Sequence, residues 1–290
     1  MSTNEQLASS VCGDAAAHAE PADATTRQAT LIEPLARPLS GAVRVPGDKS
    51  ISHRSVLFSA MAEGTSHVSG VLDSADVRSS IGAVRALGAE VNLEKRPDGS
   101  LAGDIRGWGG LGPSQPEGVI DCGNSGTGMR LLAGMLAACP FDSEMFGDAS
   151  LSSRPMGRIM QPLEQMGARI EARGTKPGCA PLSIHGGRVH PISYALPMAS
   201  AQVKSAILLA GMFADGTTTV RQPAATRDHT ERLFRHFGVP CTVDGLTVGT
   251  CGPALPVAHN LTVPADISSA AFWMVAAASR PGSRLTLRQV

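Results

Sequence analysis

Aromatic residues and excess charge are both scarce in this chain. Phe, Trp and Tyr make up 3% of its 290 residues, so a core must come from Ala, Leu, Val and Met within a hydrophobic fraction of 42%. Lys and Arg together number 25, and Asp and Glu also number 25. This balance indicates no surface for polyanions, which argues against nucleic acid as a partner. Any anionic small molecule would have to be bound locally.

Metal-binding spacings and membrane-spanning runs are lacking as well. The six cysteines show no C-x-x-C pattern and no short spacing to histidine: Cys12, Cys122, Cys139, Cys179, Cys241 and Cys251. We therefore expect neither a metal site nor a disulfide framework, and reduced thiols predict a cytoplasmic protein. The most apolar stretch, Ala206 to Ala214, is far too short to span a bilayer, so no membrane is expected as a partner.

Residues 1–30 show no apolar periodicity. They are rich in Ala, Ser, Thr and acidic residues. The segment has no hydrophobic region of the kind found in signal peptides, and it is too acidic for a transit peptide. We expect a disordered tail over residues 1–30.

Residues 48–54, which read D-K-S-I-S-H-R, occupy the start of a predicted helix. An alternating strand pattern precedes them, and apolar residues recur with helical spacing over 51–61. Lys49, Ser50 and Arg54 therefore gather at a helix N-terminus, where free N–H groups and the helix dipole favour an anion. A nucleotide-binding P-loop is not supported, because glycine does not directly precede the lysine. The alternative is a capped helix with solvated charges.

The same arrangement recurs at equal intervals of 75 residues. The serines that open the predicted helices are Ser50, Ser125 and Ser200. Each is followed within five residues by a cation, namely Arg54, Arg130 and Lys204. Three helix starts of one kind favour a common anion site over three unrelated surface turns.

A second set of helices follows the first. They are predicted over residues 76–88, 155–167 and 228–238, and each ends at a glycine before a short strand. Glycine at such a position is typical of a left-handed C-cap. The unit helix, strand, helix, strand, strand thus occurs three times, which predicts a pseudo-symmetric α/β domain.

Two further arginines stand at the starts of second helices. Arg154 comes directly before Pro155, the predicted first helical residue, and Arg227 precedes Asp228. Alone, each would be a surface arginine, but together with the first-helix cations they indicate one shared site. The G-x-G-x-x-G match at 107–112 is followed by prolines instead of a helix, so no dinucleotide cofactor is expected.

Five motifs occur in fixed order along the chain. They read V-P-G-D-K-S-I-S-H-R, G-N-S-G-T-G-M-R, S-S-R-P-M-G-R, P-M-A-S-A-Q-V-K-S-A and T-R-D-H-T-E-R. Together they resemble the 5-enolpyruvylshikimate-3-phosphate synthase (3-phosphoshikimate 1-carboxyvinyltransferase) family, from about Leu39 to the last residue. The resemblance implies transfer of an enolpyruvyl group from phosphoenolpyruvate to the 5-hydroxyl of shikimate 3-phosphate, with release of phosphate, in the shikimate pathway to chorismate and aromatic amino acids. It implies no cofactor and no metal.

The resemblance also implies a fold and a domain organisation. The fold would be α/β with repeated βαβαββ units in two domains. Residues 31–47 and 264–290 would belong to one discontinuous domain, and residues 48–263 would form the shikimate-3-phosphate-binding domain of three repeats. The sequence ends in an alternating strand pattern at 284–290, so we expect the second domain to be incomplete and the chain to be a truncated fragment.

Two binding sites between the domains follow from the resemblance, residue by residue. Shikimate 3-phosphate would be bound by Lys49, Ser50, Arg54, Ser200, Ala201, Gln202 and Arg227. Phosphoenolpyruvate would be bound by Lys49, Asn124, Gly126, Arg154 and Gln202. Lys49, which would contact both substrates, is the residue expected to be catalytic. The residue types suit the ligands, because arginine binds carboxylate or phosphate through two parallel hydrogen bonds and glycine lets backbone N–H groups approach closely.

The implied reaction is an addition followed by an elimination, which needs a base for the 5-hydroxyl and an acid for the methylene carbon. The resemblance places these groups beyond residue 290, so the chain alone is expected to be inactive and the complete protein to be a monomer. Two alternatives remain. One is an enzyme like UDP-N-acetylglucosamine enolpyruvyl transferase, which would carry a loop cysteine that S-S-R-P-M-G-R lacks. The other is a non-catalytic anion-binding fragment.

Overall fold

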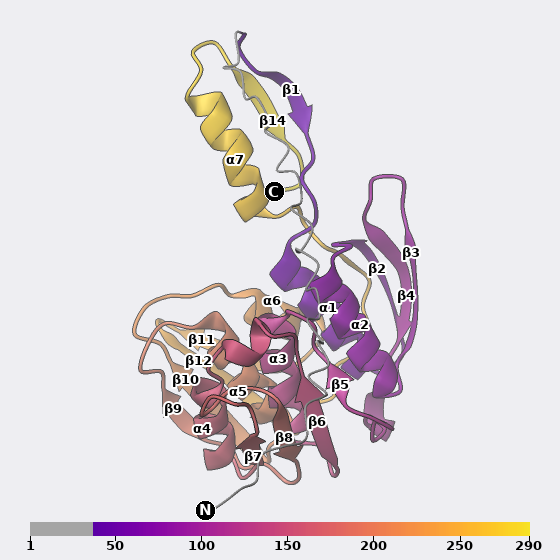
Figure 1. Cartoon of the computed structure of the whole chain (residues 1–290), viewed down its shortest axis with the longest axis vertical. Helices are drawn as coiled ribbons and strands as arrows, with labels where there is room; N and C mark the ends of the chain where they lie inside the picture. Colours follow the sequence, from indigo (N-terminus) through magenta and orange to yellow (C-terminus); the bar gives the residue numbers. More distant parts are fainter. Residues whose placement is uncertain (1–36) are drawn as a thin grey trace, which may run out of the picture. The chain divides into compact units, whose positions relative to one another are not determined.

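The structure, a computed structural model, describes residues 37–290. The predicted tail over 1–30 and residues 31–36 of the predicted discontinuous domain lie outside the described residues. Residues 38–290 form one unit in which helices and strands alternate (Figure 1). No helix between residues 37 and 290 is long and apolar enough to cross a membrane.

Three four-stranded sheets make up most of the strand content. Their strands are β2 (Thr65–Val71), β3 (Glu90–Lys95), β4 (Leu101–Arg106), β5 (Ile120–Asp121), β6 (Asp142–Phe146), β7 (Arg169–Ala172), β8 (Leu182–His185), β9 (Ser193–Ala195), β10 (Gly216–Arg221), β11 (Cys241–Asp244), β12 (Thr247–Gly252) and β13 (Leu261–Thr262). The orders are β13-β2-β4-β3, β5-β6-β8-β7 and β9-β10-β12-β11. In each sheet the first pair is parallel and the other two pairs are antiparallel. The three sheets therefore share one topology.

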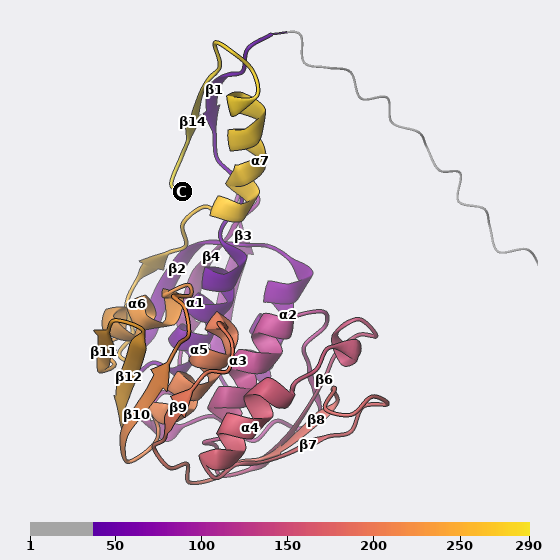
Figure 2. The same ribbon diagram turned by 90° about the vertical axis from the view of Figure 1, so that its left-hand side faces the viewer.

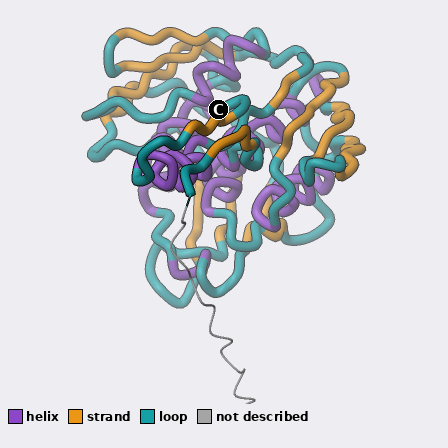
Figure 3. Tube along the Cα trace, turned by 90° about the horizontal axis from the view of Figure 1, so that it is seen from above, coloured by secondary structure: helices purple, strands orange, loops and turns teal. Residues whose placement is uncertain are grey.

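Each sheet carries two helices. The first helices are α1 (Lys49–Met61), α3 (Gly126–Leu136) and α5 (Ala201–Gly211), and the second are α2 (Ala75–Ala86), α4 (Gly157–Gln165) and α6 (His229–His236). α1, α3 and α5 lie beside one another in both side views (Figure 1, Figure 2). Viewed from above, the strands lie mostly towards the outside and the helices between them (Figure 3).

Several predicted helix ends are confirmed, but α1 is capped by Asp48, so Ser50 is its second helical residue and not its cap. Ser125 and Ser200 are N-caps whose hydroxyls accept the N–H of the third helical residue. The glycines after the second helices, Gly88, Gly167 and Gly238, have φ of +98°, +107° and +74°. These left-handed residues turn the chain from each second helix into its strand, as the glycine pattern predicts.

The first sheet obtains its edge strand from a distant part of the chain. β13 pairs with β2 in parallel, with Leu261 opposite Val68 and Thr262 opposite Ser69. β5 and β9 hold the same position in the other two sheets and directly precede α3 and α5 in sequence. The repeat is therefore βαβαββ in all three copies, and β13 supplies the first strand of the first copy.

One large apolar core joins the three repeats. It contains most side chains of α1, α3 and α5, because these three helices are buried on nearly every side. Phe58 packs against Phe234 and Phe237 with ring centroids 5.5 and 5.6 Å apart, so the scarce aromatic residues connect α1 to α6. This packing fixes the relative positions of the helix N-termini.

A second, smaller layer consists of β1 (Ser40–Val43), β14 (Arg284–Leu287) and α7 (Ile267–Ala278). β1 and β14 are parallel, with Ser40 opposite Arg284 and Val43 opposite Leu287. α7 is apolar from Ala270 to Ala278, yet Phe272 is 80% exposed and Ala270 is its one fully covered residue among those described. This layer leaves most of its apolar helix uncovered.

The predicted start of α4 is wrong. α4 begins at Gly157 instead of Pro155, and Met156 is its N-cap residue. Pro155 instead forms an isolated antiparallel bridge with Cys179. Arg154 therefore lies in a segment ahead of the helix, after a short 3-10 turn at Leu151–Ser153, and its side chain is directed by that segment.

Candidate functional site

Arg54 joins the N-terminal turns of α1 and α5 and the start of α6. Its Nε donates to Thr230 Oγ1 at 2.8 Å, its Nη2 to Ser205 Oγ at 2.8 Å, and its Nη1 to the Ser50 carbonyl at 3.1 Å. Ser205 Oγ donates in turn to the Ala201 carbonyl at 2.7 Å. The first turns of α1 and α5 are thus tied together by one guanidinium.

The structure buries Arg54, which has 3% of its surface exposed. Burial lowers the pKa of its guanidinium to about 10, while the carboxylates of Glu231 and Asp48 oppose that shift. Arg54 therefore stays charged at neutral pH. Its contact with the carboxylate of a ligand stays a prediction, and its observed role is to connect three helices.

Gln202 joins α5 to α3. Its Nε2 donates to Thr127 Oγ1 at 2.8 Å, and its Oε1 accepts from Arg130 Nη1 at 2.9 Å. Arg130 Nη1 also donates to the Gly126 carbonyl at 3.1 Å. Because both ends of the Gln202 amide are held, the side chain has a fixed orientation between two helix N-termini.

His53 completes the connections by joining α1 to α3. Its Nδ1 lies 2.8 Å from Ser80 Oγ on α2, and its Nε2 lies 3.2 Å from Ser125 Oγ, the N-cap of α3. The ring is fully buried, and burial lowers the pKa of His53 to about 4. The neutral imidazole is therefore a structural link between helix starts.

The N-termini of α1, α3 and α5 consequently meet in pairs. Several first-turn amides have no acceptor within residues 37–290, among them the N–H groups of Lys49, Ser50, Ala201 and Gln202. Unpaired N–H groups and three helix dipoles at one place stabilise negative charge. The arrangement can bind an anion with several acceptor oxygens.

The residues predicted to bind phosphoenolpyruvate lie together at the start of α3. Arg154 donates through Nη2 to Asn124 Oδ1 and, at 3.0 Å, to Ser150 Oγ. A Cβ atom placed on Gly126 would lie 2.8 Å from Arg130 Nη1 and 3.3 Å from Arg154 Nη1. Two guanidinium groups thus lie over the bare backbone of Gly126. Burial and then repulsion from Arg154 lower the pKa of Arg130, which indicates positive charge that lacks a full counter-charge.

Two predicted binding residues remain apart from these connections. Lys49 Nζ pairs with Asp76 Oδ2 on α2 at 3.0 Å, and its side chain is 52% exposed. Arg227, which precedes the N-cap residue of α6, is exposed, and its guanidinium has no hydrogen bond or ion pair with any residue of 37–290. Both cations are accessible to a ligand, and neither hydrogen-bonds to another predicted binding residue within 37–290. The charge of Arg227 is nevertheless near enough to Arg54 to contribute to the lowering of its pKa, after the larger effect of burial.

Sequence reasoning missed a buried ion pair beneath the site. The sequence indicates Lys204 as a helix-start cation, but the structure buries its side chain to 1% exposure and pairs its Nζ with Glu231 on α6. Lys204 Nζ also donates to the Arg227 carbonyl at 3.1 Å. The apolar residues all round α5 signal that Lys204 is buried, but no local pattern identifies its partner 27 residues away.

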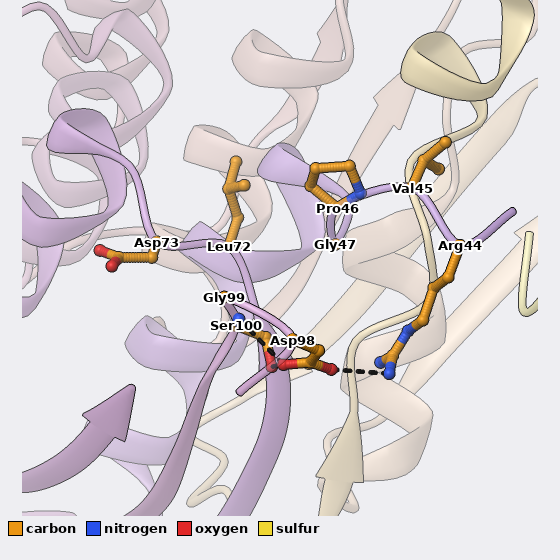
Figure 4. Close-up of a pocket in the computed structure, with 10 residues that line it drawn as sticks. Arg44, Val45, Pro46, Gly47, Leu72, Asp73, Asp98, Gly99 and Ser100 are labelled. Atoms are coloured by element: carbon orange, nitrogen blue, oxygen red, sulfur yellow. Dashed lines mark hydrogen bonds and ion pairs between the residues drawn. The ribbon is translucent and has the colours of Figure 1, made fainter. Parts of the chain in front are cut away.

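A cavity of about 250 Å³ lies elsewhere, where β1 leads into α1 (Figure 4). It is lined by Arg44, Leu72, Asp73, Asp98 and Ser100, among others, and Arg44 Nη1 donates to Asp98 Oδ2 at 2.7 Å. None of the residues predicted to bind a substrate lines it. The helix-start site is therefore distinct from this cavity.

Comparisons with known proteins agree with the motifs. A family model described as EPSP synthase (3-phosphoshikimate 1-carboxyvinyltransferase) matches residues 35–290. A 3-phosphoshikimate 1-carboxyvinyltransferase of Akkermansia muciniphila is 78% identical over 254 residues, which cover 87% of this chain and 58% of the relative. One of Halorhodospira halophila is 54% identical over 253 residues, covering 87% of this chain and 56% of the relative.

A solved structure is similar over the same range. EPSP synthase from Acinetobacter baumannii matches with a TM-score of 0.81 at 49% identity, over 89% of this chain and 57% of that chain. The predicted α/β fold with repeated βαβαββ units is thereby confirmed. The chain spans somewhat more than half of the length of these relatives.

Proposed function

The chain belongs to the EPSP synthase family, and on that premise we propose that it supplies the substrate-binding domain of a 3-phosphoshikimate 1-carboxyvinyltransferase. The enzyme would move an enolpyruvyl group from phosphoenolpyruvate to the 5-hydroxyl of shikimate 3-phosphate and release phosphate. The observation that carries the proposal is the meeting of the α1, α3 and α5 N-termini, joined by Arg54, Gln202 and His53.

Shikimate 3-phosphate would occupy the side of the site formed by α1, α5 and α6. Its phosphate would accept from the free N–H groups of Ala201 and Gln202 and from the exposed guanidinium of Arg227, with Ser200 alongside. Its ring and carboxylate would lie near Ser50, with Lys49 and Arg54 as the cations. Support comes from first-turn amides that have no acceptor within residues 37–290 and from an accessible Arg227.

Phosphoenolpyruvate would lie over the start of α3. The bare backbone of Gly126 lets the guanidinium groups of Arg130 and Arg154 lie close to the helix start. Arg154, held by Asn124, supplies a guanidinium for carboxylate or phosphate. Gln202 would contact both substrates, because it lies between α3 and α5. Lys49 would change its pairing from Asp76 to the substrates when they bind.

The reaction would proceed by addition and then elimination. The 5-hydroxyl oxygen adds to C2 of phosphoenolpyruvate and loses its proton to a base, while C3 accepts a proton from an acid. Phosphate then leaves C2, and C3 returns a proton to restore the double bond. We place the acid and base in the part of the relatives that this chain does not span, so the chain alone should not turn over. The enzyme would be cytoplasmic, monomeric and independent of metal and cofactor.

A phosphate-release assay with both substrates tests this proposal. The 290-residue chain is assayed alone and together with the remaining C-terminal part of the Akkermansia muciniphila relative. We expect background release from the chain alone and turnover on the order of 1–10³ per second with the added part. No turnover in either case, despite binding of shikimate 3-phosphate, would favour the non-catalytic anion-binding fragment. The comparisons favour this family over the UDP-N-acetylglucosamine enolpyruvyl transferase alternative.

A further inference from the structure

The Lys204–Glu231 pair lies between α5 and α6, below the helix starts that form the site. Both side chains are buried, with 1% and 3% of their surface exposed. The Lys204 ammonium donates to Glu231 Oε1 and also to the backbone carbonyl of Arg227. It therefore holds the main chain of the segment that leads into α6 directly against α5.

The pair also belongs to a wider buried polar layer. Ser205 and Thr230 are next to Lys204 and Glu231 in sequence, and their hydroxyl oxygens lie 2.7 Å apart. The carboxylate of Glu231 raises the pKa of Arg54 against the effect of burial. Two cations thus share one buried carboxylate, and Glu231 Oε2 has no hydrogen-bond partner within residues 37–290.

Stability alone does not account for such an arrangement. Desolvation of two buried charges offsets most of their attraction, and apolar residues of similar volume commonly stabilise a protein as well or better. What apolar residues could not reproduce is the hydrogen bond to the Arg227 carbonyl. The side chain of Arg227 itself makes no hydrogen bond or ion pair with residues 37–290. The place from which its guanidinium can reach a ligand is therefore set by the Arg227 backbone.

We propose that Lys204 and Glu231 are positioning residues for Arg227. Glu231 orients the Lys204 ammonium, and Lys204 fixes the backbone of Arg227, so that the guanidinium stands ready for the phosphate of shikimate 3-phosphate. The inference rests on the proposed function, because it takes Arg227 as a phosphate ligand. Neither positioning residue contacts the substrate.

The test is a double-mutant cycle on shikimate 3-phosphate affinity, measured by titration calorimetry of the 290-residue chain. Lys204→Met combined with Glu231→Met removes both members of the pair, so neither is left as an unpaired buried charge. Arg54 loses the Glu231 carboxylate as well, but it keeps the Asp48 carboxylate and its hydrogen bonds to Thr230 and Ser205. We expect this double variant to bind less tightly, by an amount that approaches the loss in Arg227→Met, about 10- to 100-fold. In the Arg227→Met background the same double variant should cause no further loss.

Two variants control for general effects on the fold. Arg232→Met removes the neighbouring exposed ion pair with Asp228, whose atoms lie 2.8 Å apart on α6, and should leave the affinity unchanged. Lys204→Arg keeps a cation and several donors and should retain most of the affinity. Circular dichroism and a thermal melt verify that each variant is folded at the temperature of the titration.

The outcomes separate the inference from the proposed function. If the double variant lowers the affinity equally with Arg227 and with Met at position 227, the inference is overturned, because the pair would then act on the whole site. An unchanged affinity in the folded apolar double variant would also overturn it. If the unaltered chain does not bind shikimate 3-phosphate at all, the proposed function itself fails.

Discussion

Acidification should destabilise the folded chain through His53. Its Nδ1 lies 2.8 Å from Ser80 Oγ, and its Nε2 lies 3.2 Å from Ser125 Oγ, which already accepts the Gly128 N–H at 2.9 Å. The Ser125 hydroxyl hydrogen is therefore available to Nε2, and the hydrogen-bond pattern assigns the ring proton to Nδ1. A second ring proton would face that hydroxyl and would add a buried charge.

The magnitude follows from the pKa of His53, which burial lowers from 6.5 to about 4, with the Asp76 carboxylate opposing the shift. Above pH 6.5 the ring is neutral in both the folded and the unfolded state. Between pH 6.5 and 4 the unfolded state binds a proton that the folded state does not, so the free energy of unfolding falls as the pH falls. The loss from pH 7 to pH 5 is about 2 kcal/mol, and it levels off at about 3 kcal/mol below pH 4.

Urea unfolding at pH 7 and pH 5, followed by circular dichroism, measures this loss in the wild type and in His53→Gln. Glutamine can still hydrogen-bond but does not titrate, and the other ionisable groups contribute equally to both proteins. We expect the wild type to lose about 2 kcal/mol more than the variant over this pH interval. Equal pH dependence in the two proteins would show that His53 does not cause the loss. An NMR titration in which the His53 ring protonates near pH 6.5 would show this independently.

Three other substitutions test the site and the core. Lys49→Met should weaken shikimate 3-phosphate binding about 10- to 100-fold in calorimetry. The control Lys95→Met removes an exposed cation that pairs with a carboxylate at 3.4 Å, and it should leave the affinity unchanged. Equal effects of the two substitutions would contradict the role of Lys49. Gly126→Ala should weaken phosphoenolpyruvate affinity, titrated with shikimate 3-phosphate present, about tenfold, because its methyl group would displace a guanidinium 2.8 Å away. The control Gly157→Ala adds a methyl group with no other atom within 4 Å, and it should bind phosphoenolpyruvate normally. Phe58→Ala should lower the free energy of unfolding in urea by about 3–5 kcal/mol, since the ring is fully buried; a loss below about 1 kcal/mol would show that the aromatic cluster does not organise the core.

The sequence predicts the repeated unit because its signals are local. The serine N-caps of α3 and α5 and the left-handed glycines after α2, α4 and α6 depend only on residues within one turn of the chain. The edge strand β13 could not be predicted in this way. Its pairing with β2 joins residues that are far apart in sequence, and two residues are too few to show a strand pattern.

The sequence identifies the segments that form the site, but it does not predict most contacts between them. The helix starts identify which segments carry Ser50, Gly126 and Ser200, because anion binding needs free N–H groups. The burial of Arg54 and the bridging role of His53 arise only when α1 packs against its neighbours. The partners of both residues lie in other segments of the chain, which only the tertiary structure brings together.

A crystal structure of the 290-residue chain with shikimate 3-phosphate would show whether the first turns of α1 and α5 form the binding site, as we propose. We expect the phosphate within hydrogen-bonding distance of the Ala201 and Gln202 N–H groups and the Arg227 guanidinium, with the ring beside Ser50. A ligand bound instead in the cavity beside Arg44 and Asp98, or no bound ligand at saturating concentration, would contradict this proposal.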